Sequence, residues 1–242
     1  MYRHEGWQYV RPAWSMLRFP MLWDGSHDQE YWHVEGGTAA TATFSVVQGQ
    51  QQIGGTEYVV ECQNGNAGGS SYFLSYLHMS PGARYYRAWW SFAWGGATSA
   101  IVDADVATLA FVIEYQLPDT TQKSLSIRAN SGGGANQVWQ VLVDDGGDAW
   151  MDLSSLPWAE AVGGHLNVYS VSGIVDVELG TIRQVAVNGI EATEIAGVYP
   201  ECGSGVADQQ GQLTSNVGLT TLNTGDLNKM WFGPHCIEAL DL

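Results

Sequence analysis

The sequence predicts an all-β protein, an antiparallel sandwich or barrel of a single domain, and three observations lead to this prediction. Short runs of alternating apolar and polar residues recur along the 242 residues, and turns rich in the chain's 30 glycines separate them. Helical periodicity is almost absent. Hydrophobic residues make up 45% of the chain, which is enough to bury a sizeable core. Because no internal repeat or linker separates two cores, we expect one domain.

About ten segments have the composition and alternation of strands, at the spacing that antiparallel sheets usually show. The candidates are residues 41–47, 57–63, 72–79, 84–94, 108–117, 124–130, 137–144, 165–171, 176–189 and 229–240. One short helix is predicted over Leu153 to Val162, where Pro157 limits its length.

The segment 85–94, "YYRAWWSFAW", shows how the strands should face. Side chains of successive strand residues point to opposite faces of a sheet. One row is wholly apolar and is predicted to be core: Tyr86, Ala88, Trp90, Phe92 and Trp94. The other row is mixed and is predicted to be outside: Tyr85, Arg87, Trp89, Ser91 and Ala93. By the same rule, Val112 and Glu114 should face away from Phe111, Ile113 and Tyr115.

Charge and cysteine content exclude several classes of protein. The chain has 9 basic and 25 acidic residues and a net charge of −16, so its surface repels nucleic acid, anionic lipid and acidic polysaccharides. The three cysteines, Cys62, Cys202 and Cys236, form no C-x-x-C pair, which argues against a zinc cluster or a disulfide framework. We expect three buried free thiols, with one bridge and one free thiol as the alternative.

The first 35 residues differ from the rest, because they hold four tryptophans and show little alternation. We interpret residues 1–35 as an extended arm that packs on the sandwich or on another subunit, with Trp7, Trp14 and Trp23 as docking anchors. The stretch lacks the continuous apolar segment of a signal peptide, and no run is long enough to span a membrane as a helix. We therefore expect synthesis in the cytoplasm without export by the general route.

Several stretches of residues 36–242 resemble a known family. These are "GGTEYVVECQNG" followed by "SYFLSYLHMSPGARYYRAWWSFAW", then "LGTIRQVAVNGIEATEI" with its Asn188-Gly189 turn, and the closing "NKMWFGPHCIEAL". In pattern and order they are similar to concanavalin A-like, laminin G-like jelly rolls, which occur in many bacteriophage tail and capsid-surface proteins. The resemblance implies a two-sheet antiparallel jelly roll over residues 36–242. Such folds host lectins, glycanases, lyases and structural modules, so function must be argued from a site.

Catalytic motifs of that fold are incomplete in this chain. Its glycanases use E-x-D-x-E, but here "IVDVE" offers only Asp176 and Glu178, which we expect to be two exposed acids. A polysaccharide lyase would need a groove in which Tyr85 or His165 acts as base. The neighbouring outward residues are candidates to line it: Arg87, Trp89, Glu114, Gln116, Ser126 and Arg128. Because the lyase motifs are absent, simple pairing of Arg87 or Arg128 with Glu114 is favoured.

The same outward residues are suited to binding a ligand, which requires fewer specific groups than catalysis does. Sugars stack on flat aromatic rings while neighbouring polar groups bond their hydroxyls. The candidate glycan- or partner-binding residues are Tyr85, Arg87, Trp89, Glu114, Gln116, Arg128 and Trp139. The acidic loops "DDGGD" (Asp144, Asp145 and Asp148) and "DAD" (Asp103 and Asp105) could supply some calcium ligands, but neither has the D-x-D-x-D-G spacing, so no metal or other cofactor is predicted and calcium is kept as an alternative.

These features together predict a non-enzymatic structural or adhesion protein of a bacteriophage particle, on its tail or capsid surface. It would be made in the host cytoplasm and reach the virion by assembly. Its partners would be other virion proteins, copies of itself in an oligomer, and a host-surface glycan. Neither nucleic acid nor membrane insertion is expected. A polysaccharide lyase or a free lectin of the same fold is the alternative.

Overall fold

The computed structural model describes eleven stretches of the chain, and every regular element in them is a strand. The described residues are 14–17, 33–35, 43–53, 56–63, 70–79, 83–95, 107–130, 138–157, 167–205, 213–221 and 229–240. Side chains are described for residues 83–92, 112–129, 138–157, 170–205 and 237–240. Within these stretches there is no helix that is both long and apolar enough to cross a membrane.

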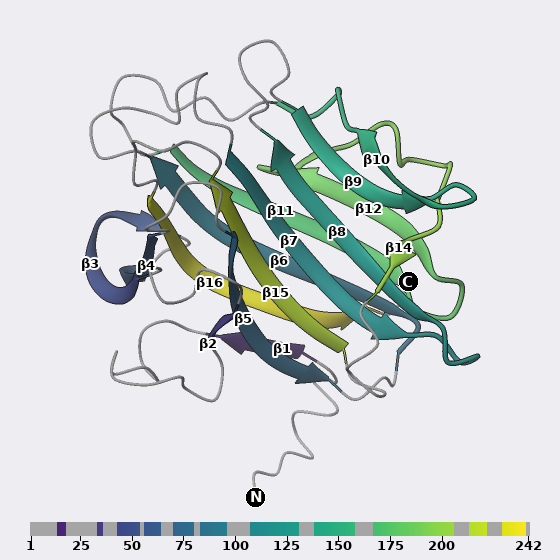
Figure 1. The fold of residues 1–242 in the computed structure, drawn as a ribbon, viewed down its shortest axis with the longest axis horizontal. Coiled ribbons are helices and arrows are strands. Elements are labelled where there is room, and N and C mark those ends of the chain that lie inside the picture. Colours follow the sequence, from purple (N-terminus) through teal and green to yellow (C-terminus); the bar gives the residue numbers. More distant parts are fainter. Residues whose placement is uncertain are drawn as a thin grey trace, which may run out of the picture.

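The strands form two antiparallel sheets that lie one above the other (Figure 1). The first sheet has the order β13 (Ile190–Glu191), β12 (Thr181–Val187), β11 (Asn167–Asp176), β6 (Tyr85–Gly95), β16 (Lys229–Leu240), β4 (Thr56–Gln63) and β3 (Thr43–Ile53), with β1 (Trp14–Leu17) paired to β16. The second sheet has the order β10 (Asp148–Asp152), β9 (Val138–Asp144), β8 (Gln122–Asn130), β7 (Ala107–Gln116), β15 (Leu213–Thr221), β5 (Ser70–Met79) and β2 (His33–Glu35), with β14 (Gly203–Ser204) paired to β8.

This all-β architecture confirms the predicted fold class, and β16 has the bounds expected for the closing strand. One predicted strand is wrong, because residues 176–189 are not continuous. They contain the end of β11, a turn at 177–180 and then β12. The Asp176 carboxylate accepts the backbone N–H groups of Glu178 and Leu179, and Gly180 takes the positive φ of 69° that closes the turn.

The predicted helix over 153–162 is also wrong in the part that the structure describes. Leu153 to Pro157 form a turn, in which the Leu156 N–H bonds to the Leu153 carbonyl at 3.1 Å. Leu153 and Leu156 are buried, so the two leucines fill the core from a turn rather than from a helix face. Residues 158–162 lie outside the described stretches.

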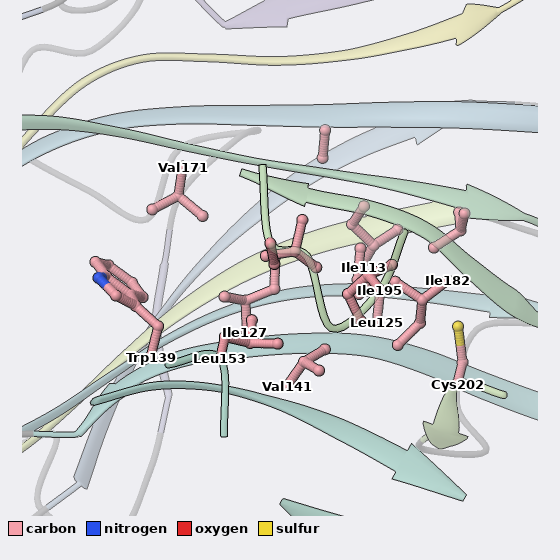
Figure 2. Close-up of a cluster of buried hydrophobic side chains, with 14 of the residues drawn as sticks. Ile113, Leu125, Ile127, Trp139, Val141, Leu153, Val171, Ile182, Ile195 and Cys202 are labelled. Atoms are coloured by element: carbon pink, nitrogen blue, oxygen red, sulfur yellow. The ribbon is translucent and has the colours of Figure 1, made fainter. Parts of the chain in front are cut away.

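The core lies between the two sheets, and the predicted facing of β6 is confirmed. Tyr86, Ala88, Trp90 and Phe92 are all buried. They meet the buried face of the second sheet, where Ile113, Tyr115, Leu125, Ile127 and Trp139 lie (Figure 2 shows part of this cluster). The Phe92 and Trp139 rings pack edge to face, with their centroids 6.4 Å apart. The side chain of Trp94 is outside the described set.

The sheets approach closely at Gly173 of β11. A Cβ placed there would lie 2.4 Å from Leu125 Cδ2 and 3.1 Å from Ile127 Cδ1 on the facing sheet. A side chain at this position would therefore overlap the packed interior, which explains a glycine inside a central strand.

Two short strands lie within the segment predicted as an arm. β1 pairs with the C-terminal half of β16, from Trp14 opposite Glu238 to Leu17 opposite His235. β2 pairs with β5, where His33 lies opposite Leu74. The arm's boundary at residue 35 and its docking role remain predictions. Trp7 and Trp23 lie outside the described stretches.

Candidate functional site

The register of the strands decides which predicted site residues share a surface. Directly opposed residues of an antiparallel pair point to the same face. In the second sheet, Arg128 lies opposite Gln140, and Gln140 opposite Asp152, so the three share the outer face. Glu114, opposite Ser124, lies on that face as well.

Arg87 and Trp89 belong to the other sheet. On the first sheet's outer face, Arg87 lies opposite Glu238 of β16 and Trp89 opposite Cys236. The groove that a lyase would need, combining Arg87 and Trp89 with Glu114, Gln116 and Arg128, does not form, because the two outer faces point away from each other. Pairing of Arg87 with Glu114 is excluded for the same reason, and Arg87 instead forms an ion pair with Glu238.

A connected polar and aromatic cluster occupies the outer face of the second sheet. We call it the Arg128 cluster, and it consists of Arg128, Gln140, Trp150 and Asp152. The guanidinium of Arg128 lies over the Trp150 indole, with Cζ 3.8 Å from the ring centroid. Arg128 Nε donates to Gln140 Oε1 at 2.7 Å, and Gln140 Nε2 donates to Asp152 Oδ1 at 2.6 Å. Each polar group thus holds the next in place, and Trp150 is half-buried beside them.

Two opposing effects act on the Arg128 guanidinium. Burial lowers the pKa of Arg128 from its usual value, while Asp152 opposes that shift. Glu114 on the neighbouring strand adds a further carboxylate to the same face. Asp152 and Glu114 thus place two carboxylates on the face that holds the Arg128 guanidinium.

A tight hairpin places Trp150 in the cluster. Gly146 and Gly147 have positive φ values of 75° and 151°, and the Gly147 N–H donates to Asp144 Oδ1 at 3.1 Å. The register of this turn sets Trp150 opposite Leu142, on the outer face. β10 and Trp150 were not predicted, although the turn residues between two alternating runs signal a hairpin.

The prediction that Trp139 is a platform for a sugar is wrong. Its side chain is fully buried, and its indole N–H donates to the Pro157 carbonyl at 3.1 Å. Figure 2 shows it among Ile127, Leu153 and other buried side chains. The alternation that placed Trp90 inside also predicts this outcome, since Trp139, Val141 and Val143 form one apolar row of β9.

The remaining predicted residues are spread over both outer faces. Trp89 and Tyr85 are half-buried on the first sheet. Gln116 is half-buried at the end of β7, where its Nε2 donates to the Thr120 carbonyl at 3.2 Å and so braces a turn. His165 lies outside the described residues.

Asp176 differs from its expected state, because it is fully buried and is not an exposed acid. Its Oδ2 accepts Arg84 Nη2 at 2.8 Å and Arg183 Nη2 at 2.7 Å. Burial acts to raise the pKa of Asp176, but the hydrogen bonds from Arg84 and Arg183 outweigh it and hold the pKa at about 2. Glu178 is exposed as expected. Asp176 is therefore a structural anchor for two arginines rather than part of a glycanase pair.

The acidic loop "DDGGD" uses its carboxylates within the protein. Asp144 Oδ2 lies 3.1 Å from Lys123 Nζ, and Asp148 Oδ1 accepts the Ser204 N–H at 2.8 Å. Among the described residues, no three His, Cys, Asp or Glu side chains come together as a metal site would require. Asp103 and Asp105 lie outside those residues, so the calcium alternative stays untested.

Cys202 is a free, fully buried thiol, as expected for the cysteines. Burial raises the pKa of Cys202 to about 12, and the Tyr115 hydroxyl donates to its Sγ at 3.0 Å. A protonated, inaccessible thiol is a poor nucleophile, so Cys202 serves packing. The side chains of Cys62 and Cys236 are not among those described.

Comparisons with known proteins agree on the fold. No family model and no curated protein sequence matches the chain. The exoplasmic/lumenal domain of VIP36, in its Ca2+/Man-bound form, matches with a TM-score of 0.52 and 11% identity over 94% of this chain and 90% of that one. A carbohydrate esterase of the Shiga toxin-encoding bacteriophage phi24B matches with a TM-score of 0.50 and 12% identity over 88% of this chain and 91% of that one. At such identities these likenesses show the fold alone, a concanavalin A-like jelly roll.

Proposed function

We propose that this chain is a non-enzymatic adhesion protein of a bacteriophage particle that binds host-surface glycans through the Arg128 cluster. The observation that carries the proposal is the Arg128 guanidinium held over the half-buried Trp150 ring, in one hydrogen-bonded chain with Gln140 and Asp152. Indole, amide, carboxylate and guanidinium groups are the side chains that recognise a sugar's apolar face and its hydroxyls.

The arrangement supports binding because the groups are already held in place. Arg128 is fixed by Gln140, and Gln140 by Asp152, so few side-chain rotamers would be lost when a ligand orders the site. The same surface in a flexible form would spend more of its binding free energy on that ordering. Preorganisation of polar groups next to a partly exposed aromatic ring suits a shallow, sheet-face glycan site.

Separation of the candidate catalytic residues supports a non-enzymatic role. Acid–base chemistry needs its groups within hydrogen-bond reach of one substrate. Here Arg87 and Tyr85 lie on one outer face while Glu114 and Arg128 lie on the other. The buried Asp176 is engaged by two arginines. A lyase would therefore have to assemble its site from residues other than those that the sequence suggested.

The setting on a phage particle rests on the sequence resemblance, and the phage phi24B match supports it by showing this fold in a bacteriophage protein. In that setting the N-terminal segment would dock onto neighbouring virion proteins. Because β1 pairs with β16, a deletion that reaches Trp14 would expose a sheet edge. Its effect on docking could then not be distinguished from its effect on folding. Truncation of residues 1–12 leaves β1 intact and tests the docking role of Trp7.

A glycan array tests the binding proposal. We expect the intact protein to bind a subset of glycans and Trp150→Ala to lose them, because the ring platform is gone. Trp89→Ala is the matched control, since it removes a half-buried indole from the opposite face. Loss of binding in Trp89→Ala but not in Trp150→Ala would place the site on the first sheet. If the protein released unsaturated or reducing ends from a bound polysaccharide, it would be a lyase and the proposal would be wrong.

A further inference from the structure

A second exposed surface lies at one end of β12, where two loops meet. The turn at 177–180 and the segment 198–202 are joined by a hydrogen bond from the Cys202 N–H to the Gly180 carbonyl at 2.8 Å. A second bond runs from the Ile182 N–H to the Pro200 carbonyl at 2.9 Å. Among the described residues, three of the four exposed large apolar side chains lie on these two loops: Leu179 at 57%, Val198 at 69% and Tyr199 at 43% exposure.

The ring of Tyr199 is held from one side by an arginine. Arg183 Cζ lies 4.5 Å from the Tyr199 ring centroid. Arg183 is itself fixed, because its Nη2 donates to the buried Asp176 carboxylate at 2.7 Å. The same guanidinium lies 5.6 Å from the centroid of Tyr85, a predicted site residue on the outer face of the first sheet. The Tyr199 ring is thus backed by a rigid cation and still exposes much of its surface.

The backbone of Tyr199 is in an unfavourable conformation. Its φ is +51°, in the left-handed region that a bulky residue rarely occupies. A glycine would adopt this conformation without strain. Such a conformation persists only where the surrounding structure over-determines it, and strained residues of this kind cluster at ligand sites.

We propose that Tyr199 is a second glycan platform, on the face opposite the Arg128 cluster, and that it takes a neutral sugar bearing a methyl group, such as a 6-deoxyhexose or an N-acetylhexosamine. A pyranose would stack its apolar face on the ring, and Leu179 and Val198 on the adjoining loops are suited to a methyl group. A neutral ligand fits better than an acidic one, because Arg183 and Arg84 already have the carboxylates of Asp176 and Glu178 as partners.

Together with the Arg128 cluster, this surface would give one molecule two separate glycan sites. The Arg128 cluster lies on the outer face of the second sheet, and the Tyr199 surface adjoins Tyr85 on the outer face of the first. One molecule could then hold two glycan chains at once. Binding to a surface that carries many copies of the glycan would gain from this bivalency without any new contact.

The test uses saturation-transfer NMR on the full chain with methyl fucoside, methyl rhamnoside and methyl N-acetylglucosaminide as probes. Methyl glucoside, which lacks the extra methyl group, and methyl glucuronoside, which is acidic, are the comparisons. The key variant is Tyr199→Gly, which removes the ring and takes the positive φ without strain, and its fold is checked by tryptophan fluorescence. Tyr199→Phe keeps the ring and is the matched control.

We expect a methyl-bearing probe to bind the parent protein, with its methyl protons receiving the largest saturation. Tyr199→Gly should weaken this binding by about tenfold or more. Tyr199→Phe should retain it, because the aromatic ring is kept. Unchanged binding in Tyr199→Gly overturns the proposal, as does a parent protein that binds none of the methyl-bearing probes. If Tyr199→Gly instead loses a stable contact with another protein and no sugar binds, the surface is a protein-docking site and the proposal is wrong.

Discussion

Replacing Asp176 by asparagine should destabilise the protein strongly, because Asp176 is the buried counter-charge of two arginines. Its pKa is lowered from 3.8 to about 2, and a pKa unit corresponds to about 1.4 kcal/mol, so the ionised form contributes about 2 kcal/mol. The variant also leaves the largely buried Arg183 without a charged partner. We therefore expect a loss of about 3 kcal/mol in the free energy of unfolding at neutral pH.

The assay is urea unfolding followed by tryptophan fluorescence. The midpoint should fall while the slope with urea stays constant, since the surface exposed on unfolding is unchanged. Glu178→Gln is the matched control, because Glu178 is exposed and lies 3.6 Å from Arg84. That change should cost about 0.5 kcal/mol or less. If Asp176→Asn costs no more than Glu178→Gln, the two-arginine anchor does not stabilise the fold.

The pH dependence of this effect has a defined sign. A carboxyl group whose pKa is lowered in the folded state stabilises the protein above its unfolded pKa, and the stabilisation is lost as pH falls through the folded value. The difference between the parent and Asp176→Asn should therefore be full at neutral pH and shrink between about pH 4 and pH 2. A difference that stays constant down to pH 2 would show that charge is not its source.

Three further predictions concern the core and the loops. Gly173→Ala should cost about 1–3 kcal/mol by urea unfolding, because its Cβ would lie 2.4 Å from Leu125 Cδ2; a neutral result would mean that Leu125 moves freely. Cys202 should resist alkylation in the folded protein and react only after unfolding, as peptide mapping by mass spectrometry can show; labelling in the native state would contradict its burial. Burial acts to raise the pKa of Glu194, but hydrogen bonds from Ser155 and Ser154 outweigh it and hold the pKa at about 2, so Glu194 should stabilise the protein at neutral pH; Glu194→Gln should unfold at lower urea at pH 7, and the gap should close towards pH 2.

The fold was predictable because its strongest signals are local. The apolar row of β6 predicts a buried strand face, and the structure confirms this at Tyr86, Trp90 and Phe92. β15, Leu213–Thr221, was missed because most of its residues are serine, threonine, asparagine and glycine, which are also typical of loops. The turn at 177–180 was missed because its signal, an aspartate capping two N–H groups, lies inside an otherwise regular run.

The site was predictable only in part, because it depends on pairing between distant strands. Arg128 and Glu114 were placed on the correct sheet face, but the sequence does not reveal that β6 and β7 belong to different sheets. Trp150 was missed together with the edge strand β10, whereas the burial of Trp139 could have been predicted from the alternation of β9. Tyr199 has no sequence signal, since its exposure, its positive φ and its contact with Arg183 arise only in the folded chain.

The central claim is that Trp150, and not Trp139, forms the glycan platform. The most direct measurement is a two-dimensional NMR spectrum of the indole N–H groups, recorded with and without a glycan that the protein binds, with the two peaks assigned through Trp150→Phe and Trp139→Phe. The Trp150 resonance should shift on binding, because its ring faces the ligand beside Arg128. The Trp139 resonance should stay in place, because its N–H is held by the Pro157 carbonyl inside the core. A Trp150 resonance that does not move while the glycan is bound would contradict the account.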